Sequence, residues 1–190
     1  MMRVRFVIKS VTTISPRRAP TVVPSPKEPR FSESRVRRSI LRILNANVLC
    51  SIATVTRGNR AHISHVYFSY SEDLEFYFLS DPRSLHCRNL TTNPSMAVTV
   101  FNSSQPWGSP GRGVQFFGTC VEARGLQATK AEHVYGKRFP KYYKYRSDLA
   151  KDSDRPFRWR FYRFIPRKVK LFDEGEFGGG VFVVAAVRKP

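Results

Sequence analysis

The chain has 190 residues, of which 41% are hydrophobic and 13% aromatic, a composition typical of one folded domain. Lys and Arg outnumber Asp and Glu by 33 to 14, giving a formal charge of +19, which attracts phosphates, nucleic acids and anionic surfaces but determines no fold. No apolar run approaches the roughly 18 residues of a membrane-spanning helix, and Cys50, Cys87 and Cys120 include no C-x-x-C pair. We therefore expect a cytoplasmic protein without a membrane span, a disulfide scaffold or a zinc ribbon.

Residues 1–34 differ in composition from the rest of the chain. Five prolines fall between residues 16 and 29, and residues 1–30 hold seven basic residues against one acid. Prolines at this density exclude a regular helix, so the segment predicts a disordered basic tail. It has no apolar core of a secretory signal, whereas its Arg-rich, acid-poor composition leaves open a transit peptide or an initiator methionine assigned too early.

The first predicted element is a helix over residues 34–46, because four aliphatic side chains recur there at helical spacing with arginines opposite. The pattern then becomes that of β-strands, rich in β-branched and aromatic residues and separated by short turns. Three successive strands of this kind indicate an antiparallel meander. They cover residues 48–56, 61–70 and 74–80.

The second half of the chain alternates further strands with two helical segments. A short helix begins at Ser84 and ends before Asn93-Pro94. Six or seven short strands with few helices favour a mainly β fold, a six- to seven-stranded antiparallel split β-barrel with flanking helices. Strands are expected at 96–102, 113–123, 155–165 and 169–172, helices at 127–139 and partly at 140–154, and a Gly-rich turn with a short last strand at 175–190.

The turn after the third strand has the composition of a phosphate-binding site. It reads Ser80-Asp81-Pro82-Arg83-Ser84 and leads directly into a helix. Helix N-termini present free N–H groups and the positive end of a dipole, which favour anions. Ser80 and Ser84 can add hydroxyl donors, and His86 can add positive charge. An ordinary capped helix after a strand has the same residues, so this pattern alone does not establish a ligand site.

The stretch ATVTRGNRAHISHVYFSYSEDLEFYFLSDPRSLHCRNLTTNPSMAVTV, residues 53–100, resembles the pyridoxamine-phosphate-oxidase-like family. GVQFFG at 113–118, YGKRFP at 135–140 and the endings WRFYRF and VKLFD extend the resemblance across residues 35–174. The resemblance implies an FMN-binding split barrel that forms a homodimer, with the cofactor between subunits. Other branches of this fold bind a deazaflavin coenzyme or haem, and both stay open as alternatives.

The family also implies which residues contact the cofactor. Leu85 and His86 stand where the family usually has Arg-Lys, which removes a bidentate phosphate clamp, and a histidine supplies only partial charge near pH 7. The expected cofactor-binding residues are Ile63, Ser64, His65 and Val66 beside the flavin ring, Ser80, Ser84, Leu85 and His86 at the phosphate, and Gln115 on a later strand.

The function that this resemblance implies is an FMN-dependent oxidoreductase acting on a small molecule. The flavin would perform the redox chemistry, so no protein nucleophile is required, and no catalytic residue is assigned. The C-terminal end lacks the Arg and His pattern of the true pyridoxamine phosphate oxidases, so the substrate stays unassigned. A non-enzymatic haem or deazaflavin carrier is the alternative.

Two weaker patterns remain, and the first of them leaves a basic nucleic-acid-binding protein as the least favoured alternative function. The run RWRFYRF at 158–164 interleaves arginines with aromatics, as nucleic-acid-binding surfaces do. Its regular alternation, with Phe157, Trp159 and Phe161 on one face, instead favours a strand with a buried aromatic face. His62 and His65 lie on opposite faces of their predicted strand, which argues against a shared metal.

Overall fold

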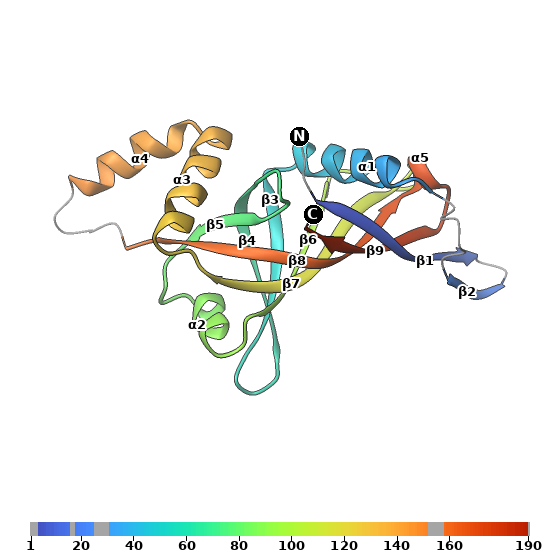
Figure 1. The fold of residues 1–190 in the computed structure, drawn as a ribbon, viewed down its shortest axis with the longest axis horizontal. Helices are drawn as coiled ribbons and strands as arrows, with labels where there is room; N and C mark the ends of the chain where they lie inside the picture. The colour runs from blue at the N-terminus through green and yellow to red at the C-terminus, as the bar shows by residue number, and fades with distance from the viewer. Residues whose placement is uncertain (1–3, 16–17, 25–30, 152–157, 190) are drawn as a thin grey trace.

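The strands of this chain pair into a single sheet that closes on itself. A computed structural model describes residues 4–15, 18–24, 31–151 and 158–189 (Figure 1). The elements in chain order are β1 (Arg5–Ser15), β2 (Arg18–Pro24), α1 (Glu33–Ala46), β3 (Leu49–Val55), β4 (Ala61–Tyr70), β5 (Phe76–Ser80), α2 (Leu85–Thr92), β6 (Ser95–Phe101), β7 (Arg112–Glu122), α3 (Leu126–Arg138), α4 (Lys141–Ala150), β8 (Arg160–Asp173), α5 (Glu174–Phe177) and β9 (Val181–Arg188).

Six of these strands form an antiparallel barrel. The sheet order is β2-β1-β9-β8-β5-β4-β3-β6-β7, and a further pairing of β8 with β7 closes the ring β8-β5-β4-β3-β6-β7. β9 and β1 extend the sheet outward from β8, and β2 pairs with β1. The sequence-based prediction of a mainly β, split-barrel fold is confirmed.

β8 is the strand that joins the barrel to its extension. It pairs with β5 through residues 160–164, with β9 through residues 168–172, and with β7 along most of its length. The sequence predicted two separate strands here, with a break near Pro166. The strand instead continues, because Pro166 lies opposite Gly118 at a register shift where β8 has one extra residue, Arg167. At such a bulge the missing N–H of proline disrupts the ladder least.

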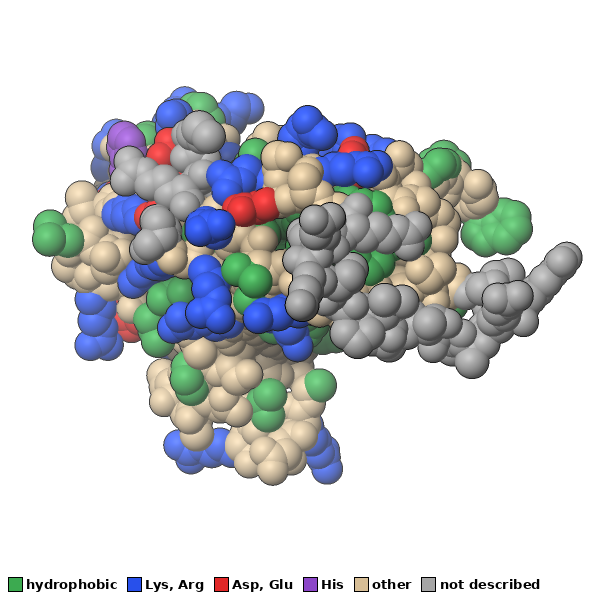
Figure 2. All heavy atoms as spheres, turned by 45° about the vertical axis from the view of Figure 1, so that its right-hand side comes forward, with side chains coloured by type: hydrophobic (Ala, Val, Ile, Leu, Met, Phe, Trp, Pro, Cys, Tyr) green, Lys and Arg blue, Asp and Glu red, His purple; other side chains and the backbone are tan. Residues whose placement is uncertain are grey.

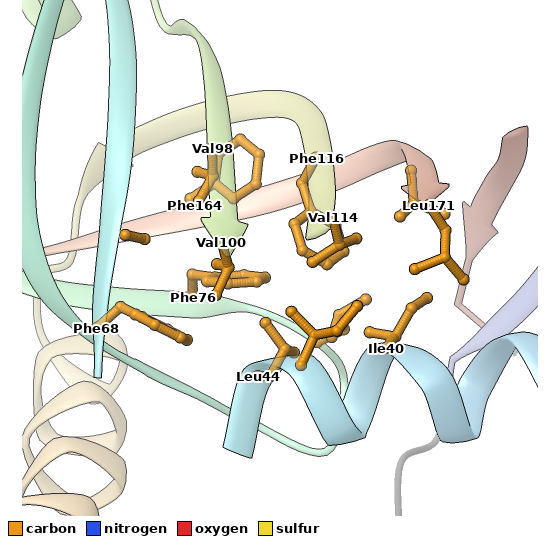
Figure 3. Packing of buried hydrophobic residues seen from close by; sticks show 14 of the residues in the cluster. Ile40, Leu44, Phe68, Phe76, Val98, Val100, Val114, Phe116, Phe164 and Leu171 are labelled. Atoms are coloured by element: carbon orange, nitrogen blue, oxygen red, sulfur yellow. The ribbon is translucent and has the colours of Figure 1, made fainter. Parts of the chain in front are cut away.

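α1 packs against the core of the barrel through the apolar face that its helical spacing predicted. Ser32 caps the helix by accepting a hydrogen bond from the Arg35 amide at 3.3 Å. Ile40 and Leu44 point from α1 toward side chains of the barrel strands (Figure 3). The buried residues shown include Phe68, Phe76, Val98, Val100, Val114, Phe116, Phe164 and Leu171.

The prediction of a disordered tail over residues 1–34 is wrong for β1. This strand pairs antiparallel with β9 from Arg5 opposite Arg188 to Thr13 opposite Val181. Phe6 and Val11 are buried in the main core together with Val183 of β9, so the expected boundaries at 35 and 174 do not separate these strands from the barrel. The prolines that suggested disorder begin only after Ser15; residues 16–17 and 25–30 lie outside the described residues.

A second, smaller core lies under α3 and α4. Tyr135 and Tyr142 pack edge-on against Phe161 of β8, with ring centroids 5.5 and 5.9 Å apart. Phe161 is buried as expected, but Trp159 precedes the strand and is 40% exposed, so the predicted aromatic face is wrong at that position. Phe157 lies outside the described residues.

Positive charge is spread over the surface rather than confined to one element. Figure 2 shows Lys and Arg side chains scattered across one face, with few acids among them. Within the described part of the chain, no helix is long and apolar enough to cross a membrane.

Candidate functional site

α2 closes one end of the barrel and thereby positions the turn that precedes it. The helix lies beside the β3–β4 hairpin (Figure 1). Its inward face is anchored by buried residues: the Asn89 side-chain amide donates to Thr54 Oγ1 at 3.0 Å, and Leu90 packs in the core. Because this face is fixed, Ser84 and His86 at the start of α2 are held close to the ends of β4 and β5.

Four of the sequence-predicted residues meet at this point, and we call them the His86 cluster: Ser64, Ser80, Ser84 and His86. His86 Nε2 lies 2.7 Å from Ser80 Oγ and 3.1 Å from Ser84 Oγ, and His86 Nδ1 lies 3.2 Å from Ser64 Oγ. The imidazole therefore joins hydroxyls from β4, β5 and the start of α2. β4 and β5 are consecutive strands that pair through the turn at Ser71–Glu75, and α2 follows β5 after a four-residue turn.

His62 adds a second imidazole, which the sequence analysis did not assign to the site. Its Nε2 lies 3.1 Å from Ser64 Oγ, and its ring lies nearly parallel to that of His86 with centroids 6.5 Å apart. The signal was available in the sequence, because His62 and Ser64 are two residues apart on one strand and share a face. Burial, and secondarily the charge of His62, lower the pKa of His86, so the cluster holds little positive charge near neutral pH.

The arginine next to the cluster is already paired. Asp81 accepts hydrogen bonds from the Arg83 amide at 2.8 Å and from Arg83 Nη2 at 2.6 Å, and these bonds lower the pKa of Asp81 to about 2. Leu85 is 42% exposed and adds no charge. Ser84 makes no side-chain cap to α2, which leaves the N–H groups of the first turn available to another acceptor. The His86 cluster therefore has several hydrogen-bond donors nearby, but it contains no unpaired guanidinium.

The other predicted residues do not join the cluster. Side chains alternate along β4, so Ser64 and Val66 face inward while Ile63 and His65 face outward; the four side chains cannot all face one ligand. Val66 is buried in the core. His65 Nδ1 lies 3.0 Å from Ser51 Oγ on the outer surface of the barrel. Gln115 lies on β7, also facing outward, and β3 and β6 separate it from β4.

The outer surface of β3 and β4 is unusually apolar for a solvent-facing strand pair. Leu49 and Tyr67 are directly paired and are 46% and 55% exposed, and Ile63 is 63% exposed. His65 and Ser51 lie between them in the same register. An exposed apolar surface of this kind is typical of a site that a partner or ligand covers.

A closed six-stranded barrel with a helix-capped cluster of hydroxyls and imidazoles at one end defines a split-barrel protein with a candidate anion site. Residues 37–172 match the family model described as "Pyridoxamine 5'-phosphate oxidase". The chain belongs to this family, as the sequence resemblance predicted. No curated protein sequence matches the chain.

Solved structures share the fold at low sequence identity. A haem-binding protein from Mycobacterium smegmatis superimposes with a TM-score of 0.62 at 15% identity, covering 83% of this chain and 59% of that one. The haem storage protein HutZ from Vibrio cholerae gives 0.58 at 17% identity, covering 79% and 95%. An FAD-binding protein from Mesorhizobium loti gives 0.51 at 19% identity, covering 79% and 93%.

Proposed function

We propose that this chain binds FMN through the His86 cluster and acts as an FMN-dependent oxidoreductase on a small molecule. The observation that carries the proposal is the meeting of Ser64, Ser80, Ser84 and His86 at the start of α2, in a chain of the pyridoxamine 5'-phosphate oxidase family. The solved FAD-binding relative is consistent with a flavin ligand on this fold.

The chemistry of the cluster fits a phosphate group. Three hydroxyls, one imidazole and the first-turn N–H groups of α2 can donate hydrogen bonds to phosphate oxygens. When bound, the isoalloxazine would supply the redox chemistry. The residues of this chain would hold the phosphate, and His86 would take up a proton to balance its charge, because Arg83 is already bonded to Asp81.

Comparing FMN with riboflavin tests the phosphate site directly, because the two ligands differ only by the phosphate. Quenching of flavin fluorescence should show FMN binding about tenfold or more tighter than riboflavin, since charge-assisted hydrogen bonds contribute roughly 1.5–3 kcal/mol each. Ser80→Ala and His86→Leu should reduce this difference. Thr91→Ala is the control, because Thr91 lies on the same helix and bonds only the Arg88 carbonyl within the described residues. Equal affinities of FMN and riboflavin for the unaltered protein would contradict the proposal.

We further propose that the functional unit is a homodimer that covers the outer surface of β3 and β4. Leu49, Ile63 and Tyr67 leave this surface apolar, and its burial would favour association. Light scattering after gel filtration should report a dimer for the unaltered protein and a monomer for Ile63→Asp. Leu126→Asp is the control, because Leu126 is 88% exposed at the start of α3. A monomeric unaltered protein, or a dimeric Ile63→Asp protein, would exclude this surface.

Haem is the second candidate cofactor, and a specific observation favours it. His65 is exposed on the outer surface, and Ser51 bonds its Nδ1, which orients the ring and leaves Nε2 toward solvent, as a haem-ligating histidine requires. Two solved structures of this fold are described as haem-binding and haem storage proteins. A Soret band that is lost in His65→Ala would select haem. An absorbance change with a deazaflavin coenzyme, without FMN uptake, would select the third alternative.

A further inference from the structure

The helix α4 carries exposed cations and aromatic rings on the surface of the molecule. It packs against α3, and in Figure 1 it lies at the edge of the molecule opposite β2. The described residues 141–151 and 158–160 include six basic side chains and one acid, Asp148. For the whole chain the ratio is 33 to 14, so this segment is more basic than the rest.

The side of α4 that faces the fold is occupied by packing. Tyr142 is buried there, in the small core under α3 and α4. Arg146 forms an ion pair with Glu132 of α3, and the ring of Tyr143 lies over Gly136 of the same helix. These contacts hold α4 in place, and its opposite side faces solvent.

That opposite side presents a stripe of lysines beside a pair of aromatic rings. Lys141, Lys144 and Tyr145 are three and four residues apart, so they lie on one side of the helix. Tyr145 is 46% exposed, and its ring centroid lies 6.1 Å from that of Trp159, which is 40% exposed. Neither ring belongs to the small core. We define the α4 face as Lys141, Lys144, Tyr145, Lys151, Arg158 and Trp159.

Within the described chain, the cations of the α4 face have no acid partner. Lys141, Lys144, Lys151 and Arg158 are all exposed, and none of them forms an ion pair with another described residue. Arg146, which points toward α3, does form one. Unpaired cations grouped with exposed rings suit a single-stranded nucleic acid, because the cations contact phosphates and the rings stack on bases.

The arrangement favours a single strand over an anionic membrane or a duplex. Tyr145 and Trp159 lie against each other, so they offer ring surfaces to a flat group instead of side chains that project into lipid. The bases of a single strand can stack on aromatic side chains, whereas those of a duplex already stack on one another. From Lys141 to Lys151 the chain rises about 15 Å along the helix. This length spans about three phosphates, which lie about 3.4 Å apart per strand in a duplex and further apart in an extended strand.

We propose that the α4 face binds single-stranded nucleic acid, with phosphates on its lysines and Arg158 and a base stacked on Tyr145 and Trp159. The contacts are to phosphates and ring surfaces, so binding does not depend on the base sequence. Four cations that each neutralise one phosphate give a slope of about −3 for log affinity against log salt concentration. The α4 face shares no residue with the His86 cluster, so this activity is independent of the proposed FMN site.

The full chain carrying Trp107→Phe tests the proposal through the fluorescence of Trp159. Trp107 is fully exposed, and the chain has only these two tryptophans, so the variant reports on the α4 face. The probes are a thymidine oligomer of about 20 nucleotides, its uridine RNA counterpart, a duplex of the same length and an abasic oligomer with the same number of phosphates. Each single strand should quench Trp159 and bind about tenfold tighter than the abasic oligomer, the usual effect of stacking one base.

Three results of this experiment would overturn the proposal. Absence of quenching by both single strands would show that the face binds no bases. Equal affinity for the abasic oligomer would show that it responds to charge alone, and tighter binding of the duplex would exclude stacking. Vesicles of equal parts phosphatidylcholine and phosphatidylserine provide the last comparison. A blue shift of Trp159 with these vesicles, and no quenching by either single strand, would identify a membrane surface instead.

Two tyrosines of α4 provide a matched pair of variants. Tyr145→Ala should weaken binding of the thymidine oligomer about tenfold and leave binding of the abasic oligomer unchanged. Tyr143→Ala is the control, because Tyr143 is 47% exposed on the same helix but lies over Gly136, outside the α4 face. Thermal melting shows whether both variants are folded. Equal losses in two folded variants would contradict the proposal.

Two lysines provide a second pair of variants that removes no aromatic packing. Lys144→Gln should lower the affinity for the thymidine oligomer about fivefold at roughly 0.1 M salt and reduce the salt slope by about 0.7, the value for one phosphate contact. Lys9→Gln is the control, because Lys9 is an exposed lysine of β1. The same loss in both variants would mean that the oligomer responds only to net charge, which would exclude the α4 face. If Tyr145→Ala does not fold, this pair decides the outcome.

Discussion

Two polar clusters of this barrel, one around the buried Glu75 and one the half-buried His86 cluster, differ in how completely their charges are matched. Glu75 at the start of β5 is 1% exposed and contacts Arg163 Nη2, Lys189 Nζ at 2.7 Å and Lys130 Nζ at 3.1 Å. Tyr77 also donates to it at 2.8 Å. The His86 cluster, in contrast, holds hydroxyls and imidazoles with no carboxylate and no unpaired guanidinium.

The difference separates a structural cluster from a candidate binding site. Burial alone would raise the pKa of Glu75, but hydrogen bonds from Arg163, Lys189, Tyr77 and Lys130 hold it well below its usual range. That carboxylate has no capacity left for a ligand. Burial instead lowers the pKa of His86, and the cluster contains no carboxylate that would repel an anion. Its hydroxyls and imidazoles are therefore able to donate hydrogen bonds to an incoming anion.

The largest expected effect comes from removing the Glu75 charge. Glu75→Gln leaves Arg163 largely buried without its counter-charge, and breaking such a pair destabilises a protein by about 3 kcal/mol. Urea unfolding followed by fluorescence measures the change. The exposed Glu122–Arg124 pair provides the control, because Glu122→Gln should cost less than about 1 kcal/mol. Similar losses in both variants would show that Glu75 is not a special structural residue.

Lowering the pH tests the same difference between Glu75 and the His86 cluster. The pKa of Glu75 is depressed in the folded state, so its stabilisation is complete above its unfolded pKa of about 4.3 and is lost as the pH falls through the lower folded value. The unaltered protein should therefore lose more stability than Glu75→Gln when the pH is lowered from 5 to 2. Parallel pH profiles for the two proteins would contradict the assignment.

The next effect is a gain at the His86 cluster. Leu85→Arg places a guanidinium where the family usually has one, on a position that is already 42% exposed. A bidentate Arg–phosphate contact should strengthen FMN binding about tenfold and leave riboflavin binding unchanged. Fluorescence titration with both ligands measures this. An equal gain for riboflavin would mean that the new arginine contacts the ring or ribityl chain instead of the phosphate.

The smallest effect is the pH dependence of FMN binding. A bound phosphate stabilises the imidazolium and raises the pKa of His86 from its depressed value in the free protein. FMN affinity should therefore increase by about threefold as the pH falls from 8 to 6.5, before protonation of the phosphate near pH 6 opposes it. Riboflavin should show no such trend, and His86→Gln should remove it. A trend that persists in His86→Gln would place the titrating group elsewhere.

Much of the local structure could be predicted from the sequence, because it depends on residues close together in the chain. The helical spacing of Ile40 and Leu44 predicted α1, and strand alternation predicted β3 to β7. The motif at Ser80–Ser84 marked the start of α2 and the candidate phosphate site. The family resemblance implied the barrel topology and grouped Ser80, Ser84 and His86, whose side chains lie within hydrogen-bond distance in the structure.

Other features depend on which distant segments pair, and local periodicity carries no such information. The proline density of residues 16–29 predicted a disordered tail that included β1, and no local pattern indicated that β1 pairs with β9 at the other end of the chain. Ser64 joins His86, whereas His65 faces outward, because register assigns each residue of β4 to one side of the sheet.

The sequence by itself therefore determined most of the elements from α1 to β7, the barrel class and the position of the polar turn. Only the tertiary structure decided that Lys189 reaches Glu75 and that Tyr145 lies beside Trp159. The physical reason is that the sequence of one strand determines which of its side chains lie on each face of the sheet. Its neighbouring strands and its register depend instead on which pairing buries the whole core.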